Sequence, residues 1–308
     1  MSWEKVFLAL FIFPGLLYAV PMAWLMLWLE RKFRARMQGR LGPPFYQPFF
    51  DFVKLMAKQQ ILRPSFDSLL MAGLPLVAVS AGFVALALLP VSSDSGGFAG
   101  DLVLLVAFLE VPSLCAVLAG FASRSIFGQV GATREALLSI TYNLPFLTAI
   151  VALASSAQSL RLMDIAAAPA GGVRALAVLT LCLCLPVKLR LNPFSLANAE
   201  QEIYSGPATE FSGPPLAMWE LTHGLEWVAL TGLVVCLGLP FRTGTWVGDL
   251  ALFAGFSLVL VILLTILAAG TARLKIPQAA RFYWRWGMGL SLVALILGVL
   301  PGIERFIR

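Results

Sequence analysis

The sequence predicts an all-α, polytopic membrane protein with about eight transmembrane helices. Hydrophobic residues make up 59% of the 308-residue chain, charged residues make up only 12%, and the mean hydropathy is +0.88. A soluble domain is closer to about 45–50% apolar and about 25% charged. The apolar residues also fall into separate runs of about 20, the length that a helix needs to cross a bilayer. We therefore expect a single integral membrane domain over residues 1–308.

Eight apolar runs are candidate spans, and they follow one another along the whole chain. Glu30, Arg31 and Lys32 come directly after the first run, where a signal peptide would have a cleavage-site pattern, so we expect that run to be retained as a span. Pro186 and Lys188 crowd the end of the fifth run and make it the weakest of the eight. The runs cover about residues 6–29, 68–91, 100–122, 137–157, 173–190, 216–240, 250–270 and 284–303.

The basic residues predict the topology. Eight spans place both ends of the chain on one side of the membrane, and the connections on the opposite side hold 16 of the 22 Lys and Arg residues. By the positive-inside rule, the side with 16 is cytoplasmic. The sequence thus predicts a prokaryotic cytoplasmic-membrane protein with both termini outside. The net charge of +6 belongs to these connections and does not indicate a nucleic-acid partner.

Metal, nucleotide and redox chemistry have little support in this chain. The four cysteines all lie in apolar runs without a C-x-x-C pair, and one histidine is too few for a usual metal cage. Neither G-x-x-x-x-G-K-[ST] nor G-x-G-x-x-G occurs. We expect no catalytic centre, metal or cofactor in this chain, so that any electron carriers would belong to partner chains.

We expect an amphipathic helix at the membrane surface after the first span. Gly42, Pro43 and Pro44 would end a preceding helix. Apolar and charged residues then alternate at helical spacing, which is typical of a helix lying in the interface. Such a helix either only carries topology charges or also forms a docking floor for a peripheral protein. The charged docking candidates are Arg31, Arg34, Arg36, Arg40, Asp51, Lys54 and Lys58.

Three glutamates are concentrated between the fifth and sixth runs. The chain has only 16 acidic residues, yet Glu200, Glu202 and Glu210 fall within eleven positions. A carboxylate costs roughly 2.5–3.5 kcal/mol at the centre of a membrane helix, so such residues usually face a protein interior or a wet cavity and often handle protons. A solvated acidic loop is the alternative. Neighbours such as Phe194 and Phe211 favour a packed segment.

The sixth run contains Glu220, His223 and Glu226 at three-residue spacing, which places them in one slanting polar stripe on a helix. A buried His–Glu cluster of this kind occurs in proton relays. The alternative is a simple satisfied pair of His and Glu. Both interpretations stay open from the residues alone.

Two further acids are candidates for the same path. Glu110 is a single acid in the middle of the third run, which makes it a functional candidate by default. Glu135 follows Arg134 at the cytoplasmic edge of the fourth run. That pair is either part of the path or only an ion pair at the start of a helix, where it would interact with the helix dipole.

Three segments together resemble one family. They read RKFRARMQGRLGP…QPFFDFVKL, GFASRSIFGQVGATREALLS and PFSLANAEQEIYSGPATEFSG, in that order. They resemble the signature stretches of the respiratory complex I subunit 1 family, which includes the membrane subunits of energy-converting nickel–iron (NiFe) hydrogenases and of formate hydrogenlyase. REALL and EQEIYSGPATEFSG look closer to this hydrogenase branch. Ser195, Asn198 and Asn143 stand where complex I members usually carry acids, and another usual glutamate falls at or near His223.

The resemblance implies a junction between a peripheral redox arm and ion-pumping membrane subunits. Peripheral hydrogenase-like small and large subunits, with iron–sulfur clusters and a NiFe site, and antiporter-like membrane subunits would be the partners. The region from Arg34 to Lys58 matches the surface that meets the redox arm. Glu200, Glu202 and Glu210 match glutamates of the family's lateral acidic path. The full set of expected path residues is Glu110, Glu135, Glu200, Glu202, Glu210, Glu220, His223 and Glu226.

The leading hypothesis is therefore a non-redox subunit of a hydrogenase-type complex that links electron transfer to proton or sodium translocation. Within the same family, the alternative is the quinone-site subunit of an NADH:quinone oxidoreductase. A passive membrane anchor is an alternative of another class. The lack of an internal repeat counts against an independent ion transporter.

Overall fold

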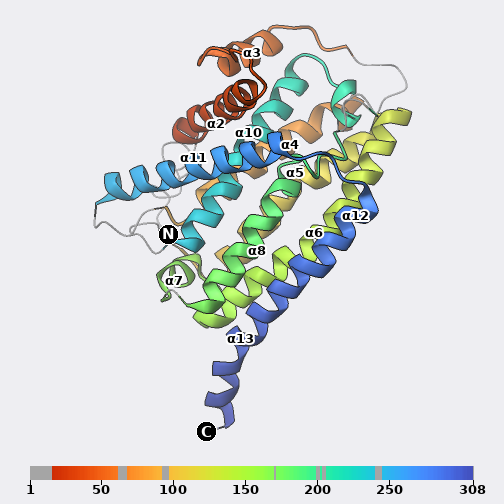
Figure 1. The fold of residues 1–308 in the computed structure, drawn as a ribbon. Helices are drawn as coiled ribbons and strands as arrows, with labels where there is room; N and C mark the ends of the chain where they lie inside the picture. Colours follow the sequence, from red (N-terminus) through yellow and green to blue (C-terminus); the bar gives the residue numbers. More distant parts are fainter. Residues whose placement is uncertain are drawn as a thin grey trace.

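The chain is described by a computed structural model over residues 16–61, 68–91, 97–169, 171–198, 202, 206–239 and 245–307. These residues form helices joined by short connections, and no strand occurs among them (Figure 1). The prediction of an all-α membrane protein is confirmed. The helices are α2 (Leu16–Met37), α3 (Gln47–Met56), α4 (Ser68–Ala87), α5 (Asp101–Ala122), α6 (Ile126–Ala157), α7 (Leu162–Ala167), α8 (Gly172–Lys188), the 3-10 helix η1 (Gly206–Glu210), α10 (Pro214–Gly238), α11 (Trp246–Gly270), α12 (Ile276–Phe282), the π-turn η2 (Tyr283–Gly287) and α13 (Met288–Ile307).

Six helices in the described part of the chain are long and apolar enough to cross a membrane. They comprise 69–87, 101–122, 126–157, 214–238, 247–270 and 276–300. The predicted count of eight is not confirmed by this criterion. The first predicted span, 6–29, begins outside the described residues, and the C-terminal end of α2 is rich in charge. The fifth corresponds to α8, which has only 17 residues.

Two helices begin earlier than the apolar runs predict. The run 137–157 belongs to α6, which already begins at Ile126, and the run 284–303 belongs to a helix that begins at Ile276 and continues through the π-turn. In α6 the early turns carry Arg134 and Glu135, whose charges have partners elsewhere in the fold. Because these charges are paired, they do not have to lie in a loop.

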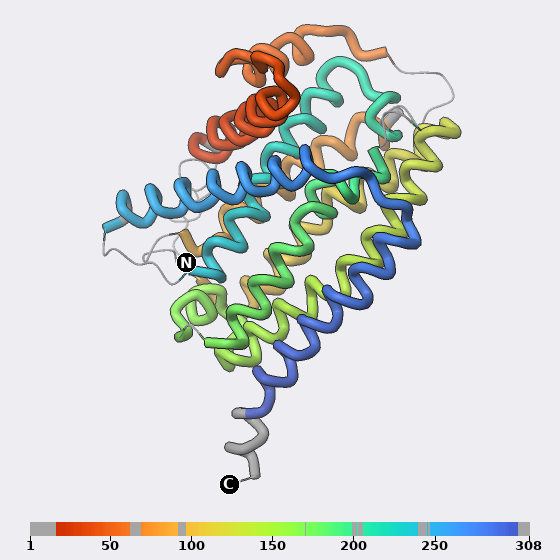
Figure 2. The backbone as a smooth tube through the Cα atoms, in the orientation of Figure 1, coloured from red at the N-terminus to blue at the C-terminus, as the bar shows by residue number. Residues whose placement is uncertain are grey.

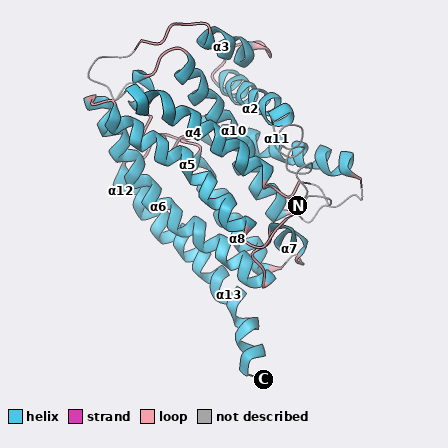
Figure 3. Ribbon diagram, turned by 180° about the vertical axis from the view of Figure 1, so that it is seen from behind, coloured by secondary structure: helices cyan, strands magenta, loops and turns pink. Residues whose placement is uncertain are grey.

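The central helix is α10. Buried residues make up 83% of its apolar window, against 28% for α11 and for the last helix. It packs against α2, α4, α8 and α11 (Figure 3). Glycines permit close contact: a Cβ at Gly224 would lie 2.9 Å from the Cβ of Ala23, and one at Gly232 would lie 2.7 Å from the ring of Phe253. Small residues at helix interfaces are typical of membrane bundles.

The outer helices frame this centre. Helices α6 and α13 run side by side along one edge of the bundle (Figure 2), while α11 packs on α2 and α10. Leu263 on α11 and Ile296 on α13 leave 56% and 59% of their surface exposed. Apolar side chains that face outward on long apolar helices are suited to contact with lipid.

The predicted surface helix is present as α3. It contacts α2 and α10 at one end of the bundle (Figure 1). Asp51 on α3 forms an ion pair with Arg31 on α2 at 2.9 Å. The outward face carries Phe50 and Val53, which are 54% and 45% exposed. Apolar side chains of α3 thus face away from the bundle, on the amphipathic helix that the sequence pattern predicts.

Candidate functional site

Close packing places the connection between α8 and α10 against the first turns of α6. A Cβ at Gly131 on α6 would lie 2.8 Å from the Cδ of Pro207 in η1 and 3.2 Å from the carbonyl oxygen of Ala197. A Cβ at Gly120 on α5 would meet the Cβ of Ala132 at 2.6 Å. These glycines allow α5, α6 and η1 to pack closely. Charged side chains from α6, from the connection after α8 and from α10 then meet in the interior of the bundle.

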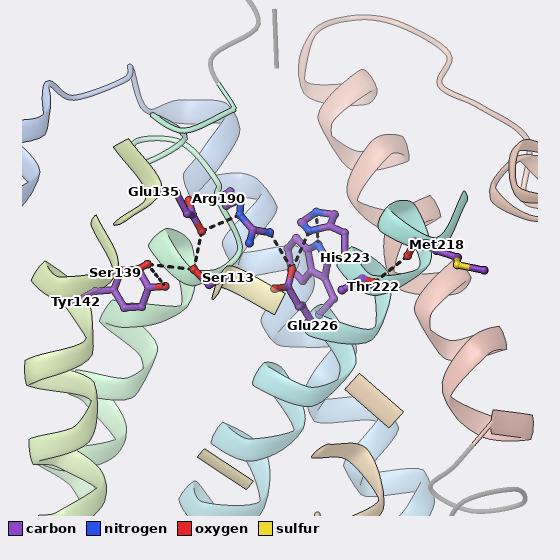
Figure 4. Close-up of polar contacts among 10 residues, drawn as sticks. Ser113, Glu135, Ser139, Tyr142, Arg190, Met218, Thr222, His223 and Glu226 are labelled. Carbon is purple, nitrogen blue, oxygen red and sulfur yellow. Dashed lines mark hydrogen bonds and ion pairs between the residues drawn. The ribbon is translucent and has the colours of Figure 1, made fainter. Parts of the chain in front are cut away.

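Arg190 is at the centre of that interior. Its Nε lies 3.1 Å from Glu135 Oε1 on α6, and its Nη1 lies 3.0 Å from Glu226 Oε2 on α10. Both carboxylates are buried, with only 5% and 7% of their surface exposed. His223 Nδ1 lies 3.5 Å from the same oxygen of Glu226. Figure 4 shows Arg190 between the two glutamates. We call Glu135, Arg190, His223 and Glu226 the Arg190 cluster.

The backbone at Arg190 is held in an unusual conformation. Its φ is 53°, in the left-handed region that costs a non-glycine residue about 1–2 kcal/mol. Residues in such conformations persist only when their surroundings hold them, and they gather at functional sites. Here the two glutamates hold the guanidinium from opposite sides.

Hydrogen bonding indicates the tautomer of His223. Trp227 Nε1 donates to His223 Nε2 at 3.3 Å, and the indole nitrogen is only a donor. In a neutral imidazole the other nitrogen, Nδ1, then carries the proton and faces Glu226. With His223 neutral, two carboxylates face one guanidinium, so the cluster has a net charge of −1. A buried net charge is costly, and binding one further proton would neutralise it.

A second buried ion pair lies farther along α5 and α6. The ammonium of Lys188, at the end of α8, pairs with Glu110 Oε1, and Asn143 Nδ2 donates to Glu110 Oε2 at 2.9 Å. The ammonium also lies 4.9 Å from the ring centroid of Tyr142 and 4.2 Å from that of Phe146. Lys188 is buried, whereas 19% of the Glu110 side chain is exposed. We call this the Glu110–Lys188 pair.

Of the three glutamates between α8 and α10, Glu202 pairs with two cations outside the Arg190 cluster. Glu202 lies 2.5 Å from Arg134 and 4.0 Å from Arg273, with half of its side chain exposed. The hydrogen bond from Arg134 lowers the pKa of the Glu202 carboxyl below its usual value. Glu210 ends η1, and Glu200 lies outside the described residues. Glu202 thus belongs to a partly exposed ion pair, and its place in a proton path stays a prediction.

Four of the seven predicted docking residues, Arg31, Asp51, Lys54 and Lys58, line a cavity between α2, α3 and α10. Arg31 pairs with Asp51 and also approaches Glu220 at 3.7 Å. Lys54, Lys58 and Glu220 line the same cavity of about 230 Å³, together with Trp24, Leu27, Pro48, Phe52, Leu55 and Leu221. Arg34 pairs with Glu30 on its own helix, and Arg36 and Arg40 are exposed. Glu220 therefore lines this cavity, and it also lines a second cavity of about 140 Å³ together with His223 and Arg190.

Sequence reasoning missed the cations of the site. The charge pattern assigns Lys188 and Arg190 to topology, yet both are partners of buried carboxylates. One signal could have identified them. An acid inside a membrane bundle needs a compensating charge. Lys188 and Arg190 come just after Pro186 at the end of an apolar run, where they are close enough to the bundle to supply that charge. The described residues place no group of three His, Cys, Asp or Glu side chains that could hold a metal ion.

The fold and the site define a class: a multi-pass helical membrane protein whose interior carries linked ion pairs. The chain belongs to the NADH dehydrogenase family, whose sequence model matches residues 9–299. The prediction of the complex I subunit 1 family is thereby confirmed.

Relatives from both branches of the family are similar to this chain. It is 31% identical to hydrogenase-4 component C of Escherichia coli, over 87% of this chain and 88% of that protein. It is 29% identical to an NADH-quinone oxidoreductase subunit of Syntrophobacter fumaroxidans, over 96% and 97% of the two chains. A chain in the structure of the membrane-bound sulfane sulfur reductase, an archaeal respiratory membrane complex, superposes with a TM-score of 0.86 at 25% identity, covering 96% of this chain and 99% of that one.

Proposed function

We propose that this chain is the membrane junction subunit of a multi-subunit, hydrogenase-type redox complex, in which it links electron transfer in partner chains to proton or sodium translocation. It performs no redox step itself. Peripheral small and large subunits would carry the iron–sulfur clusters and the NiFe site, and antiporter-like subunits would adjoin it in a prokaryotic cytoplasmic membrane, with its termini outside. The similarity to hydrogenase-4 component C supports the hydrogenase branch.

The observation that carries the proposal is the Arg190 cluster. Two buried carboxylates share one guanidinium, so the cluster can exist with or without one extra proton. A small change in its surroundings can shift the balance between these states, because electrostatic interactions are strong in a medium of low dielectric constant. This property suits a group that takes up a proton at one stage of turnover and releases it at another.

The redox arm would dock on α3 and the charged end of α2. The aromatic outer face of α3 and the exposed Arg36 and Arg40 support a peripheral protein partner there. Ion pairs from Arg31 to Asp51 and Glu220 tie this surface to α10, the helix that carries Glu226. A displacement of α3 during turnover would therefore be transmitted through α10 to the Arg190 cluster.

The test is Glu135→Gln in membrane vesicles that contain the whole complex. The substitution leaves Glu226 and Arg190 as a neutral pair, so the complex should assemble while ion translocation per electron pair falls severely. Asp164→Asn, at an exposed carboxylate on α7, is the matched control and should have no effect. Full translocation by assembled complexes with Glu135→Gln and with Glu226→Gln would show that the chain is a passive anchor.

A quinone-site function in a complex I-type enzyme is the second candidate, and the cavity at α3 favours it. Aromatic and aliphatic side chains line that cavity beside Arg31, Asp51 and Glu220, a mixture that can hold a ring with polar substituents. A photoreactive quinone analogue tests this function. Labelling of Trp24 or Phe52 that an excess of quinone prevents would support it, and an absence of such labelling favours the hydrogenase type.

A further inference from the structure

We propose that Ser113, Ser139 and Tyr142 form a hydroxyl chain that carries protons between the Arg190 cluster and the Glu110–Lys188 pair. The inference rests on the proposed function and adds three neutral side chains to a path otherwise made of charged ones. It assigns a role to residues that lie between the two buried ion pairs.

The hydroxyl groups are within hydrogen-bonding distance of one another (Figure 4). Ser113 Oγ donates to Glu135 Oε1 at 2.9 Å, and the same oxygen lies 3.0 Å from Ser139 Oγ. Ser139 Oγ lies 3.3 Å from the hydroxyl of Tyr142. In the two hydroxyl–hydroxyl contacts either oxygen can be the donor, so the chain can be oriented in both directions.

Helix geometry explains why the chain is continuous. Glu135, Ser139 and Tyr142 have i, i+4, i+7 spacing, which places them in one stripe on α6. The stripe advances about 10 Å along the helix, at about 1.5 Å per residue. Glu110 and Ser113 are three residues apart on α5 and therefore share the face that packs on this stripe. The three hydroxyls thus form a connected row that starts at Glu135 and ends at Tyr142, whose ring lies beside the ammonium of Lys188.

Ser113 and Ser139 form hydrogen bonds with other side chains, whereas neighbouring hydroxyls in this bundle bond to the backbone of their own helix. Serine and threonine in helices often donate to the backbone carbonyl one turn earlier. Thr141 donates to the Leu137 carbonyl at 2.8 Å, and Thr148 donates to that of Leu144 at 2.7 Å. Ser113 and Ser139 bond from side chain to side chain. Tyr142 and Ser113 are also buried, with 2% and 7% of their surface exposed.

Each transfer step conserves atoms and charge. A protonated Glu135 donates to Ser113, Ser113 passes its own proton to Ser139, and Ser139 passes its own to the Tyr142 hydroxyl. Each oxygen gains one proton as it releases another, so no hydroxyl is left ionised. The final step runs from Tyr142 to Glu110 through Lys188, whose ammonium lies above the tyrosine ring. Lys188 passes one of its protons to Glu110 and takes up the proton that Tyr142 releases, so that it ends as an ammonium again. When Glu110 is protonated, Lys188 loses its counter-charge, which favours release of the proton from the partly exposed Glu110.

The experiment compares Tyr142→Phe, Ser113→Ala and Ser139→Ala in vesicles that contain the whole complex. Tyr142→Phe is the sharpest of these variants because it keeps the ring beside Lys188 and removes only the oxygen. Each is expected to slow coupled ion translocation by about tenfold or more, since a positioned proton-transfer group typically contributes 10²–10⁴-fold. Electron transfer with an uncoupler present and the thermal stability of the complex should stay unchanged. Ser139→Thr keeps the hydroxyl that Ser139→Ala removes, and it should therefore translocate ions as the parent complex does.

Thr141→Val is the matched control, because it removes a hydroxyl next to Tyr142 that bonds only one turn back on its own helix. If Glu135→Gln stops translocation but Tyr142→Phe and Ser139→Ala do not slow it, the hydroxyl chain is wrong and the proposed function stands. If Glu135→Gln and Glu226→Gln also leave translocation intact, the proposed function fails as well. An equal loss in Thr141→Val would show that the effect is general damage to α6 and would overturn the proposal.

Discussion

At the scale of single residues, Arg190 determines how the interior charges are balanced. Its guanidinium contacts two buried carboxylates from different helices. Removing one partner of a buried ion pair typically destabilises a protein by about 3–5 kcal/mol, because an uncompensated charge stays behind. Arg190→Gln is therefore expected to lower the thermal stability of the purified complex severely. The double variant Arg190→Gln/Glu135→Gln leaves only one buried carboxylate and should recover part of the loss. A single variant as stable as the parent would contradict this account of the cluster.

The sequence predicted the acids of the site better than their partners. Glu110, Glu135, His223 and Glu226 were expected in a path, and the structure places Glu135, His223 and Glu226 around Arg190 and Glu110 beside Lys188. Acids are rare in this chain and conspicuous in apolar runs. The cations were obscured because lysine and arginine are common in membrane connections, where they set topology. Only the folded chain shows that Arg190 points inward.

At the scale of elements, the contact between α6 and η1 keeps the connection after α8 in place. A Cβ at Gly131 would lie 2.8 Å from Pro207 and 3.0 Å from the Cα of Gly206, so Gly131→Ala must displace η1 or α6. We expect it to lower both the thermal stability and the yield of assembled complex. Gly73→Ala on α4 is the control, because a Cβ there meets nothing within 4 Å and alanine favours a helix over glycine by about 1 kcal/mol. Equal effects of the two substitutions would disprove the packing argument.

Helix boundaries were less predictable from the sequence than helix existence. The apolar run of the fourth span starts near residue 137, yet α6 begins at Ile126. A search for apolar runs stops at Arg134 and Glu135, because each charge is costly in a membrane when it stands alone. Tertiary pairing to Glu202 and Arg190 removes that cost and lets the helix continue. The same limit applies to any helix whose charges find partners only in the folded protein.

At the scale of the whole molecule, the weakest span has a structural explanation. Helix α8 has 17 residues, about 25 Å at 1.5 Å per residue, against a hydrocarbon core of about 30 Å. It ends at Lys188, and both Lys188 and Arg190 lie in the interior of the bundle. Irregular backbone at membrane depth is tolerated where protein surrounds it. We infer that α8 crosses most of the membrane and that the connection after it completes the crossing inside the protein.

This inference gives a prediction about topology. Position 160 follows α6 and position 272 follows α11, with α8, α10 and α11 between them. Three crossings place these positions on opposite sides of the membrane, whereas two crossings without α8 place them on the same side. Leu160→Cys and Ala272→Cys are exposed positions for a membrane-impermeant thiol reagent. We expect Leu160→Cys to react from outside intact cells and Ala272→Cys to react only after permeabilisation. The parent chain, with its four native cysteines, is the control. Reaction of both variants from the same side would mean that α8 does not cross and that the eight-span topology is wrong.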